Sequence, residues 1–316
     1  MKNFLSMNDL KKEEIEKIFE MAEKFKNEVF FPKPQCAGLL FDGPSTRTRV
    51  SFEVALRQFG MHPIYLDYVF SQLARGEKIE DTGKVLSSYV NIIITRLHKH
   101  EMLKRLASSS SVPVINAGTD LEHPCQILGD LYTLKQIGLL KKETQMAYIG
   151  DPASNVAHSL IIGTKKFGIN IIFIAPKGYR PNPEYEKEYG EDIEIINDFN
   201  NYNDYNINTN NTKNKIDGID VIYVNAFDTH EENLKKFFPY QLNLVRMKKL
   251  SAKFFMHPLP AFRGIEINDD LLESKFSLVW KQAENKVAVQ KALIIYLLSL
   301  PSLPSADTVS VAVGGL

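Results

Sequence analysis

Hydroxyl and guanidinium groups alternate in the segment STRTR, residues 45–49. The segment lies between an apolar stretch that predicts a strand (37–42) and a pattern that predicts a helix. Ser45 or Thr46 can cap that helix and leave free backbone N–H groups at the positive end of its dipole. A capped helix with arginines on its solvated face is the alternative, but so many donors directly after a strand favour a phosphate-binding site. The sequence has no GxxxxGK[ST] or GxGxxG motif, which argues against a nucleotide polyphosphate.

Two further segments, HPCQ (123–126) and HPLP (257–260), carry polar groups where predicted strands end. His123 offers a proton donor near neutral pH, and Gln126 offers one donor and one acceptor. The prolines of HPLP force an extended backbone, whose carbonyl groups can accept from an amide NH2 group. Taken alone, HPCQ is more typical of a plain helix cap, and HPLP fits a turn that leaves a sheet equally well.

Strands and helices must alternate to position these segments. Apolar stretches predict strands at residues 37–42, 63–67, 91–95, 112–116, 146–150, 169–176, 220–225, 253–257 and 276–280. Helical spacing of apolar residues predicts helices that include 13–29, 46–60, 123–138, 155–168 and 283–300. This alternation predicts an α/β fold of two doubly wound parallel-sheet domains joined by helices. We expect the domains to comprise residues 1–140 and 141–283, with the helix at about 284–300 packing back on the first domain and a tail at 301–316.

Composition excludes several classes of protein. The chain has 316 residues, and 38 Lys and Arg balance 38 Asp and Glu, which argues against a nucleic-acid-binding surface. Two cysteines, Cys36 and Cys125, cannot form a disulfide framework, and no Cys/His cluster suggests a metal site. Without a signal-peptide pattern or an apolar run that approaches the about 20 residues of a membrane span, we expect a cytoplasmic protein. Residues 197–214 contain nine asparagines in eighteen positions, which predicts a mobile surface insertion.

STRTR, HPCQ and HPLP, in this order and at these distances, resemble the motifs of the aspartate/ornithine carbamoyltransferase family. The resemblance covers about residues 2–300. It implies that the first domain binds carbamoyl phosphate and the second binds an amine acceptor. It also implies an active site between the domains and across a subunit interface, in a homotrimer or a multiple of trimers. The resemblance implies no metal and no organic cofactor.

Within this family, the chain is most similar to the ornithine branch. Ser71-Gln72, followed by Arg75-Gly76-Glu77, resembles the loop with which that branch reaches into the neighbouring subunit's site. Asn155, which follows Gly150-Asp151, matches the residue that holds the acceptor's α-amino acid group in that branch. The aspartate branch would be expected to carry an arginine here.

Three positions depart from the ornithine pattern. Residues 225–231 replace a DxWxSMG signature, so that Asn225 stands in place of the aspartate that would pair with the acceptor's ammonium group. Pro258 replaces a cysteine, and Lys286 replaces an arginine for carbamoyl phosphate, which keeps the charge but loses bidentate geometry. The resemblance places Asn155, Asn225, Thr229 and His230 at the acceptor.

The resemblance also implies roles on the donor side, with Arg47, Arg96, His123 and Gln126 as the catalytic residues. The phosphate would be held by Ser45, Thr46, Arg47 and Thr48, with help from Gln72 of the neighbouring subunit. Arg96 and His123, with Thr48, would polarise the carbamoyl oxygen as negative charge develops on it. Gln126 and the carbonyl groups of Pro258 and Leu259 would hold the carbamoyl NH2 group, and Lys286 would contribute charge. The leaving phosphate itself is the base that we expect to accept the amine's proton.

The first hypothesis is therefore transfer of a carbamoyl group to ornithine, which gives citrulline and phosphate. The altered segment 225–231 keeps open another acceptor: aspartate, a diamine such as putrescine, or a modified ornithine. A non-catalytic relative that only binds carbamoyl phosphate is a third hypothesis, and the retained donor residues argue against it. A dehydrogenase on a doubly wound sheet is disfavoured because the glycine fingerprint is absent.

Overall fold

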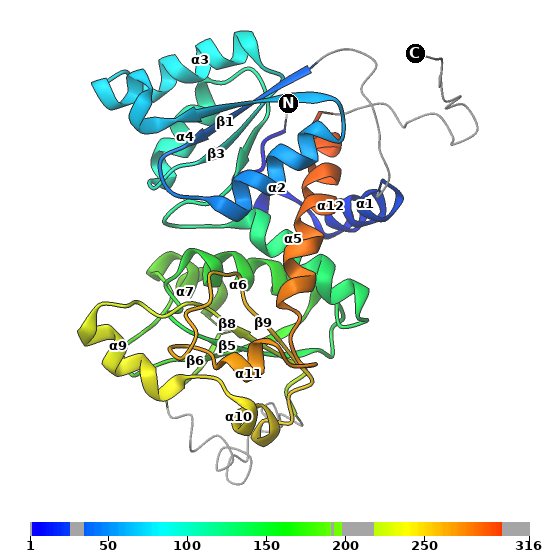
Figure 1. Cartoon of the computed structure of the whole chain (residues 1–316), viewed down its shortest axis with the longest axis vertical. Helices are drawn as coiled ribbons and strands as arrows, with labels where there is room; N and C mark the ends of the chain where they lie inside the picture. Colours follow the sequence, from blue (N-terminus) through cyan, green and yellow to red (C-terminus); the bar gives the residue numbers. More distant parts are fainter. Residues whose placement is uncertain (1, 26–34, 191–192, 198–217, 299–316) are drawn as a thin grey trace.

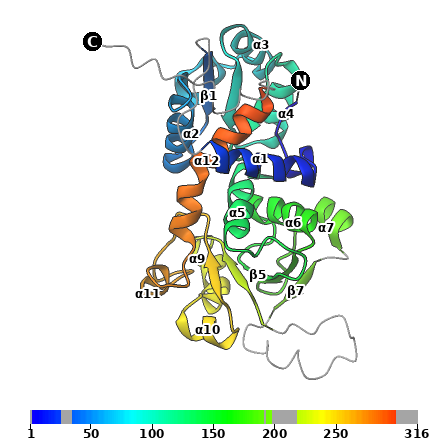
Figure 2. The same cartoon turned by 90° about the vertical axis from the view of Figure 1, so that its right-hand side faces the viewer.

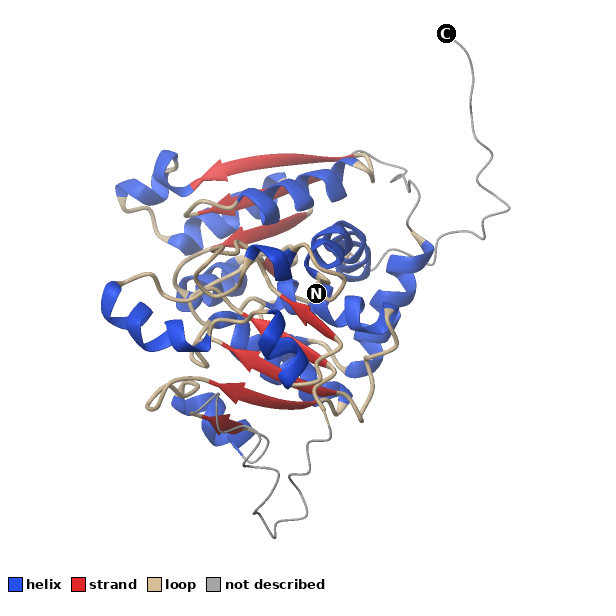
Figure 3. Ribbon diagram, turned by 60° about the horizontal axis from the view of Figure 1, so that its bottom comes forward, coloured by secondary structure: helices blue, strands red, loops and turns tan. Residues whose placement is uncertain are grey.

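The computed structural model of the chain describes residues 2–25, 35–190, 193–197 and 218–298. Two parallel β-sheets, each covered by helices, form its two α/β domains (Figure 1). The first sheet has the order β2-β1-β3-β4 and the second the order β7-β6-β5-β8-β9. Figure 3 shows the strands of both sheets in red and the helices that cover them in blue. The predicted fold class is confirmed.

The strands of the first sheet are β1 (Gln35–Phe41), β2 (Met61–Asp67), β3 (Ile92–Arg96) and β4 (Val114–Asn116). Those of the second sheet are β5 (Gln145–Ile149), β6 (Asn170–Ile174), β7 (Glu194–Ile196), β8 (Val221–Val224) and β9 (Phe254–Met256). In the first sheet the strand order reverses between β1 and β3, and in the second between β5 and β8. Ligands of doubly wound folds bind outside the carboxyl ends of the strands at such reversal points. Each sheet therefore offers one half of a site.

The helices of the first half are α1 (Lys12–Lys24), α2 (Thr46–Arg57), α3 (Ile79–Tyr89), α4 (His100–Ser109) and α5 (Pro124–Gln136). The later helices are α6 (Asn155–Phe167), α7 (Pro183–Tyr189), α9 (Glu231–Phe237), α10 (Leu244–Lys249), α11 (Asp269–Leu272) and α12 (Val279–Leu297). Helix α5 lies at the junction of the two sheets, and all its residues from Pro124 to Leu134 are buried (Figures 1 and 2). Helix α12 packs against α1, α2 and α5, and so spans the same junction.

The largest hydrophobic core is continuous across this junction. It contains Phe41 of β1, Leu131 of α5, and Tyr148 and Tyr223 of the second sheet. Alternate residues of the second sheet, such as Ile149, face a separate core on its other side. Because burial of large side chains on both sides of α5 fixes that helix, the polar residues at its amino end are held in place.

Several predicted elements differ from the structure. The predicted strand at 276–280 is wrong: Ser277 forms only an isolated bridge to Phe255, and α12 already begins at Val279. A short buried apolar run does not distinguish a strand from the first turn of a buried helix, which explains the error. The short helices α7, α9, α10 and α11 and the strand β7 escaped prediction because they have too few residues to show periodicity. Most of the asparagine-rich segment, the tail at 301–316, and the ends of the helices predicted at 13–29 and 283–300 lie outside the described residues.

In the part of the chain that the structure describes, no helix combines the length and the apolar character that a membrane crossing requires.

Candidate active site

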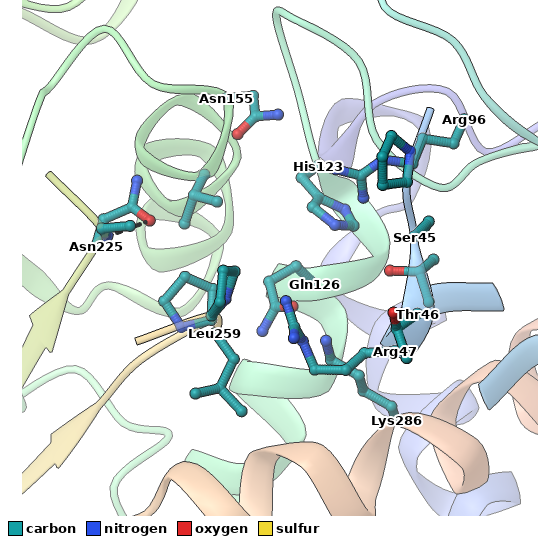
Figure 4. Close-up of a pocket in the computed structure, with 16 residues that line it drawn as sticks. Ser45, Thr46, Arg47, Arg96, His123, Gln126, Asn155, Asn225, Leu259 and Lys286 are labelled. Carbon is teal, nitrogen blue, oxygen red and sulfur yellow. Dashed lines mark hydrogen bonds between the residues drawn. The ribbon is translucent and has the colours of Figure 1, made fainter. Parts of the chain in front are cut away.

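A cavity of about 390 Å³ opens where the carboxyl ends of the two sheets face each other (Figure 4). The loop after β1, the first turn of α2 and the end of β3 contribute Pro44, Ser45, Thr46, Arg47, Thr48 and Arg96. Helices α5 and α12 contribute His123, Gln126 and Lys286. The amino end of α6 and the loops after β8 and β9 contribute Asn155, Val156, Asn225, Ala226, Pro258, Leu259 and Pro260.

The cavity gathers most of the residues that the sequence singled out. Every predicted donor-side residue lines it except Gln72, and the predicted acceptor residues Asn155 and Asn225 line it too. Gln72, Thr229 and His230 are exposed and do not line the cavity of their own chain. Pro44, Val156, Ala226 and Pro260 are lining residues that the sequence reasoning missed, since apolar side chains next to a motif carry no chemical signal of their own.

The amino end of α2 supplies unpaired hydrogen-bonding groups. Ser45 occupies the N-cap position, but its side chain makes no capping hydrogen bond, in contrast to Ser154 at α6, whose Oγ accepts from the N–H of Ala157. The ψ angle of Ser45 is 75°, against 151° at Ser154, so the backbone at Ser45 departs from the extended conformation that the capping serine of α6 adopts. Ser45 Oγ is buried and has no hydrogen-bond partner. An unpaired hydroxyl beside free helix N–H groups is typical of an anion site.

Only one of the two arginines in STRTR faces the cavity. Arg47 lines it, and burial lowers the pKa of its guanidinium. Arg49 points elsewhere: its Nε donates to Glu53 Oε1 at 2.7 Å, and its guanidinium lies 3.4 Å from the centre of the Tyr65 ring. The sequence reasoning counted both guanidiniums toward the site, and for Arg49 this was wrong because a glutamate one helical turn away holds its side chain.

Positive charge in the cavity is not compensated by any acidic lining residue. Arg47, Arg96 and Lys286 line it, and none of its described lining residues is Asp or Glu. Burial lowers the pKa of Arg96, an effect that Asp42 opposes and Arg47 reinforces. Burial, reinforced by the two arginines and opposed by Asp130, lowers the pKa of Lys286 to about 8. Three partly or fully desolvated cations in one cavity create a strong local preference for an anion.

His123 occupies the N-cap position of α5 and is buried. Burial, with help from the charges of Arg96 and Lys286, lowers the pKa of His123 well below its ordinary value. The lowered pKa disfavours the charged ring, and the N–H of the neutral ring can still donate a hydrogen bond, so a donor role for His123 stays a prediction. The N–H of its backbone donates to Ser159 Oγ at 2.9 Å, while its ring Nδ1 is buried without a partner.

Acceptors for an amide NH2 group line the same cavity as the cations. Gln126 Nε2 donates to Asp130 Oδ1 at 2.9 Å, which leaves Gln126 Oε1 as an acceptor. The carbonyl oxygens of Pro258 and Leu259 take no hydrogen bond from any described residue. Leu259 has a φ of 58°, which is uncommon for a residue with a side chain, and its N–H donates to His257 Nδ1 at 2.8 Å.

The second-sheet side of the cavity carries amides rather than charges. Asn155 Nδ2 donates to the carbonyl of Thr119 at 2.5 Å. Asn225 Nδ2 donates to Ser154 Oγ at 3.2 Å, and Asn225 Oδ1 accepts from the N–H of Ala226 at 3.0 Å. This side can therefore form hydrogen bonds to a polar molecule but offers no full charge to it.

The described ranges hold no cluster of three or more His, Cys, Asp or Glu side chains that could bind a metal ion. The arrangement can instead bind a phosphate group among its cations, polarise a carbonyl oxygen beside His123 and Arg96, and hold an adjacent NH2 group with Gln126 and the two free carbonyls. A second polar molecule can enter from the side of Asn155 and Asn225.

Comparison with known proteins agrees with this geometry. Residues 2–136 match the family model described as aspartate/ornithine carbamoyltransferase, carbamoyl-P binding domain, and residues 142–297 match that of the Asp/Orn binding domain. The chain is 38% identical to an ornithine carbamoyltransferase of Archaeoglobus fulgidus, over 96% of this chain and 99% of that protein. It is also 38% identical to the enzyme of that name from Aquifex aeolicus, over 95% and 99%.

Two solved structures illustrate both branches of the family. The ornithine carbamoyltransferase from Pyrococcus furiosus superposes with a TM-score of 0.84 at 36% identity and covers 95% of this chain and 98% of its own. The catalytic subunit of M. jannaschii aspartate transcarbamoylase superposes with a TM-score of 0.79 at 28% identity, with the same coverage.

Replacing Arg47 by Ala should raise the Kd for inorganic phosphate by about 10²-fold, because it removes charged hydrogen bonds worth about 1.5–3 kcal/mol. Isothermal titration calorimetry measures this. Arg49→Ala is the matched control, since its side chain faces Glu53 and Tyr65, and it should bind phosphate like the unaltered protein. Equal losses in both variants would contradict the assignment of Arg47 to the anion.

Proposed function

The chain belongs to the aspartate/ornithine carbamoyltransferase family, and from this premise we propose that it transfers the carbamoyl group of carbamoyl phosphate to L-ornithine, giving L-citrulline and phosphate. The observation that carries the proposal is the pairing, in one cavity, of uncompensated cations with acceptors for an NH2 group. Carbamoyl phosphate presents the complementary groups: a phosphate dianion, a carbonyl oxygen and an NH2 group.

Each part of carbamoyl phosphate has residues to hold it. Ser45, Thr46, Thr48 and Arg47 bind the phosphate at the amino end of α2, where the helix dipole adds to the attraction. Thr48, Arg96 and His123 donate to the carbonyl oxygen. Gln126 Oε1 and the carbonyls of Pro258 and Leu259 accept from the NH2 group, and Lys286 adds positive charge beside them.

Catalysis then rests on charge development at the carbonyl oxygen. As the amine attacks, this oxygen becomes negative in the tetrahedral transition state, and prearranged donors stabilise it without reorganising. His123 suits this role as an uncharged hydrogen-bond donor, because the lowered pKa of its ring favours the neutral form, whose N–H donates a hydrogen bond without transferring its proton. The attacking amine must be unprotonated on nitrogen, and the leaving phosphate takes up the proton that the amine releases. No covalent bond to the protein is needed, so positioning supplies much of the acceleration.

Asn155 and Asn225 face the acceptor. Thr229 and His230 follow Asn225 on one loop, and a role for them in acceptor binding requires that loop to approach the cavity. The neutral acceptor side favours a second candidate function, carbamoyl transfer to an amine other than ornithine, because no carboxylate among the described lining residues can pair with ornithine's α-ammonium group.

We propose in addition that the enzyme is a homotrimer in which Gln72 completes the site of the neighbouring subunit. Exposed apolar side chains support an interface on the first domain: Val50 and Val54 of α2, and Val69 and Phe70 close to Gln72, with Phe70 91% exposed. Light scattering should give the mass of three chains or a multiple of three, and a monomer would contradict this.

We assign residues 1–140, together with α12, to the domain that binds the donor, and residues 141–283 to the domain that binds the acceptor. We also propose that the protein is cytoplasmic, which its two free thiols support.

The proposal is tested by incubating the enzyme with carbamoyl phosphate and ornithine and measuring citrulline, with aspartate and putrescine in parallel. Citrulline formation well above the rate with the other two amines supports ornithine as the acceptor. Turnover of a different amine would support the second candidate. If a folded protein that binds carbamoyl phosphate released no phosphate with any of these amines, the proposal that it is an enzyme would be wrong.

Donor binding should weaken as the pH rises through about 8. The pKa of Lys286 lies near this value, and only its protonated form attracts the phosphate dianion. Above it, the Kd of carbamoyl phosphate should therefore rise by up to about tenfold per pH unit, until the pKa of the bound state is reached. Lys286→Arg remains charged and should keep a nearly constant Kd between about pH 7 and about pH 9.5. If the Kd of carbamoyl phosphate changed with pH in the same way in both proteins, Lys286 would not contribute to donor binding.

Replacing Asn225 by Asp should lower the KM for ornithine, because a carboxylate at this position can pair with the α-ammonium group. A charged hydrogen bond is worth about 1.5–3 kcal/mol, so a decrease of about tenfold or more is expected. The KM for putrescine, which has no α-carboxylate and carries its ammonium groups at its two ends, serves as the comparison. An unchanged KM for ornithine would mean that residue 225 does not contact the acceptor.

A further inference from the structure

A buried carboxylate lies behind the cavity wall. Asp130, on α5, is 2% exposed and does not line the cavity, yet side chains from three elements donate to it. Gln126 Nε2, one turn earlier on α5, lies 2.9 Å from Oδ1, and Gln282 Nε2, on α12, lies 2.7 Å from the same oxygen. The hydroxyl of Tyr223, on β8, lies 2.7 Å from Oδ2.

The chemistry of Asp130 decides the orientation of Gln126. An ionised carboxylate only accepts hydrogen bonds, so the end of the Gln126 amide that faces it must be the NH2 group. The opposite end, Oε1, is then the atom available to the cavity. An amide in the reverse orientation would place two N–H donors against the NH2 group of the bound substrate, which is itself a donor.

The same carboxylate is linked to the other walls of the site. Tyr223 lies two residues before Asn225 on the strand that leads to the acceptor side. Gln282 not only donates to Asp130 but accepts, through Oε1, from the N–H of His257 at 2.9 Å, directly before the free carbonyls of Pro258 and Leu259. Asp130 thus connects the donor helix, the acceptor strand and the turn that holds the NH2 group.

Burying the charge of Asp130 costs desolvation free energy, and good packing alone would not require a charged residue here. Burial raises the pKa of Asp130 to about 6, even though Gln282, Tyr223, Lys286 and Gln126 all act to lower it. Replacing a buried charged group by apolar residues is often neutral or stabilising, so the buried carboxylate of Asp130 suggests a role beyond stability.

We infer that Asp130 is a positioning residue: it holds the Gln126 amide with Oε1 toward the carbamoyl NH2 group and, through Tyr223 and Gln282, aligns that group with the acceptor strand and the Pro258–Leu259 turn. This inference rests on the proposed carbamoyl transfer. It assigns to Asp130 no contact with the substrate.

Asp130→Asn keeps the shape but brings an NH2 group that can donate, so Gln126 is free to turn over. The kcat for carbamoyl transfer should fall by about 10²-fold, as expected for a misplaced substrate group. Asp220→Asn is the matched control. Asp220 directly precedes β8, whereas Asn225 directly follows it, so the two residues lie at opposite ends of this strand. Asp220 accepts a hydrogen bond from the N–H of Gln145 and forms an ion pair with Lys253. The Asp220→Asn variant should keep the kcat of the unaltered enzyme.

A double-mutant cycle with Gln126→Leu separates positioning from simple structural damage. If Asp130 acts through Gln126, adding Asp130→Asn to Gln126→Leu should lower kcat only a few-fold further. A loss of the same factor in both backgrounds, or an Asp130→Asn enzyme with unaltered kcat, would overturn the inference.

Tyr223→Phe tests the link to the acceptor strand and keeps the carboxylate, so it serves if Asp130→Asn does not fold. It should raise the acceptor KM by about tenfold and leave the Kd of carbamoyl phosphate unchanged. An unchanged acceptor KM would overturn the coupling. The unaltered enzyme is assayed alongside with the amine that it uses: if it turns over no amine, the proposed function fails, whereas variants that match an active enzyme refute only the role of Asp130.

Discussion

The gathering of three cations in one cavity, with no acidic side chain in its described lining, is the constraint on which the rest of the site depends. Arg47, Arg96 and Lys286 line it without an acidic neighbour in the described lining, and burial lowers the pKa of each. Removing cations from water is costly unless an opposite charge arrives. Binding of a dianion therefore offsets part of the desolvation cost of these cations. Burial, together with the charges of Arg96 and Lys286, also lowers the pKa of His123, which favours its uncharged form.

The fold brings these charges together because the two points of reversed strand order, between β1 and β3 and between β5 and β8, lie on either side of the cavity. Arg96 ends β3 and the STRTR segment follows β1, while Asn225 follows β8 and the HPLP turn follows β9. Neither sheet alone encloses the cavity. Helix α5 joins the two halves, since its buried face belongs to a core that continues into both sheets, and its amino end presents His123 and Gln126. Asp130 extends the same connection through polar groups.

Motif spacing was sufficient to predict that STRTR, HPCQ and HPLP come together, because strand ends and helix starts fix where these segments lie, and residues of all three line one cavity. It was insufficient wherever a contact distant in sequence decides the outcome. The direction of Arg49 depends on Glu53 and Tyr65, and the protonation of His123 depends on Arg96 and Lys286. Asp130 lies four residues after Gln126 on one helical face, a spacing that could have drawn attention to it, but Tyr223 and Gln282 reach it only through the tertiary fold.

The central claim is that the charged cavity is built for carbamoyl phosphate whatever amine follows. It is tested most directly by calorimetric titration of carbamoyl phosphate into the protein in the absence of any acceptor, with inorganic phosphate as the comparison. The account predicts one site per chain and tighter binding of carbamoyl phosphate, because Gln126 and the carbonyls of Pro258 and Leu259 add contacts that inorganic phosphate cannot make. Equal affinity for the two ligands, or no binding by a folded protein, would contradict it.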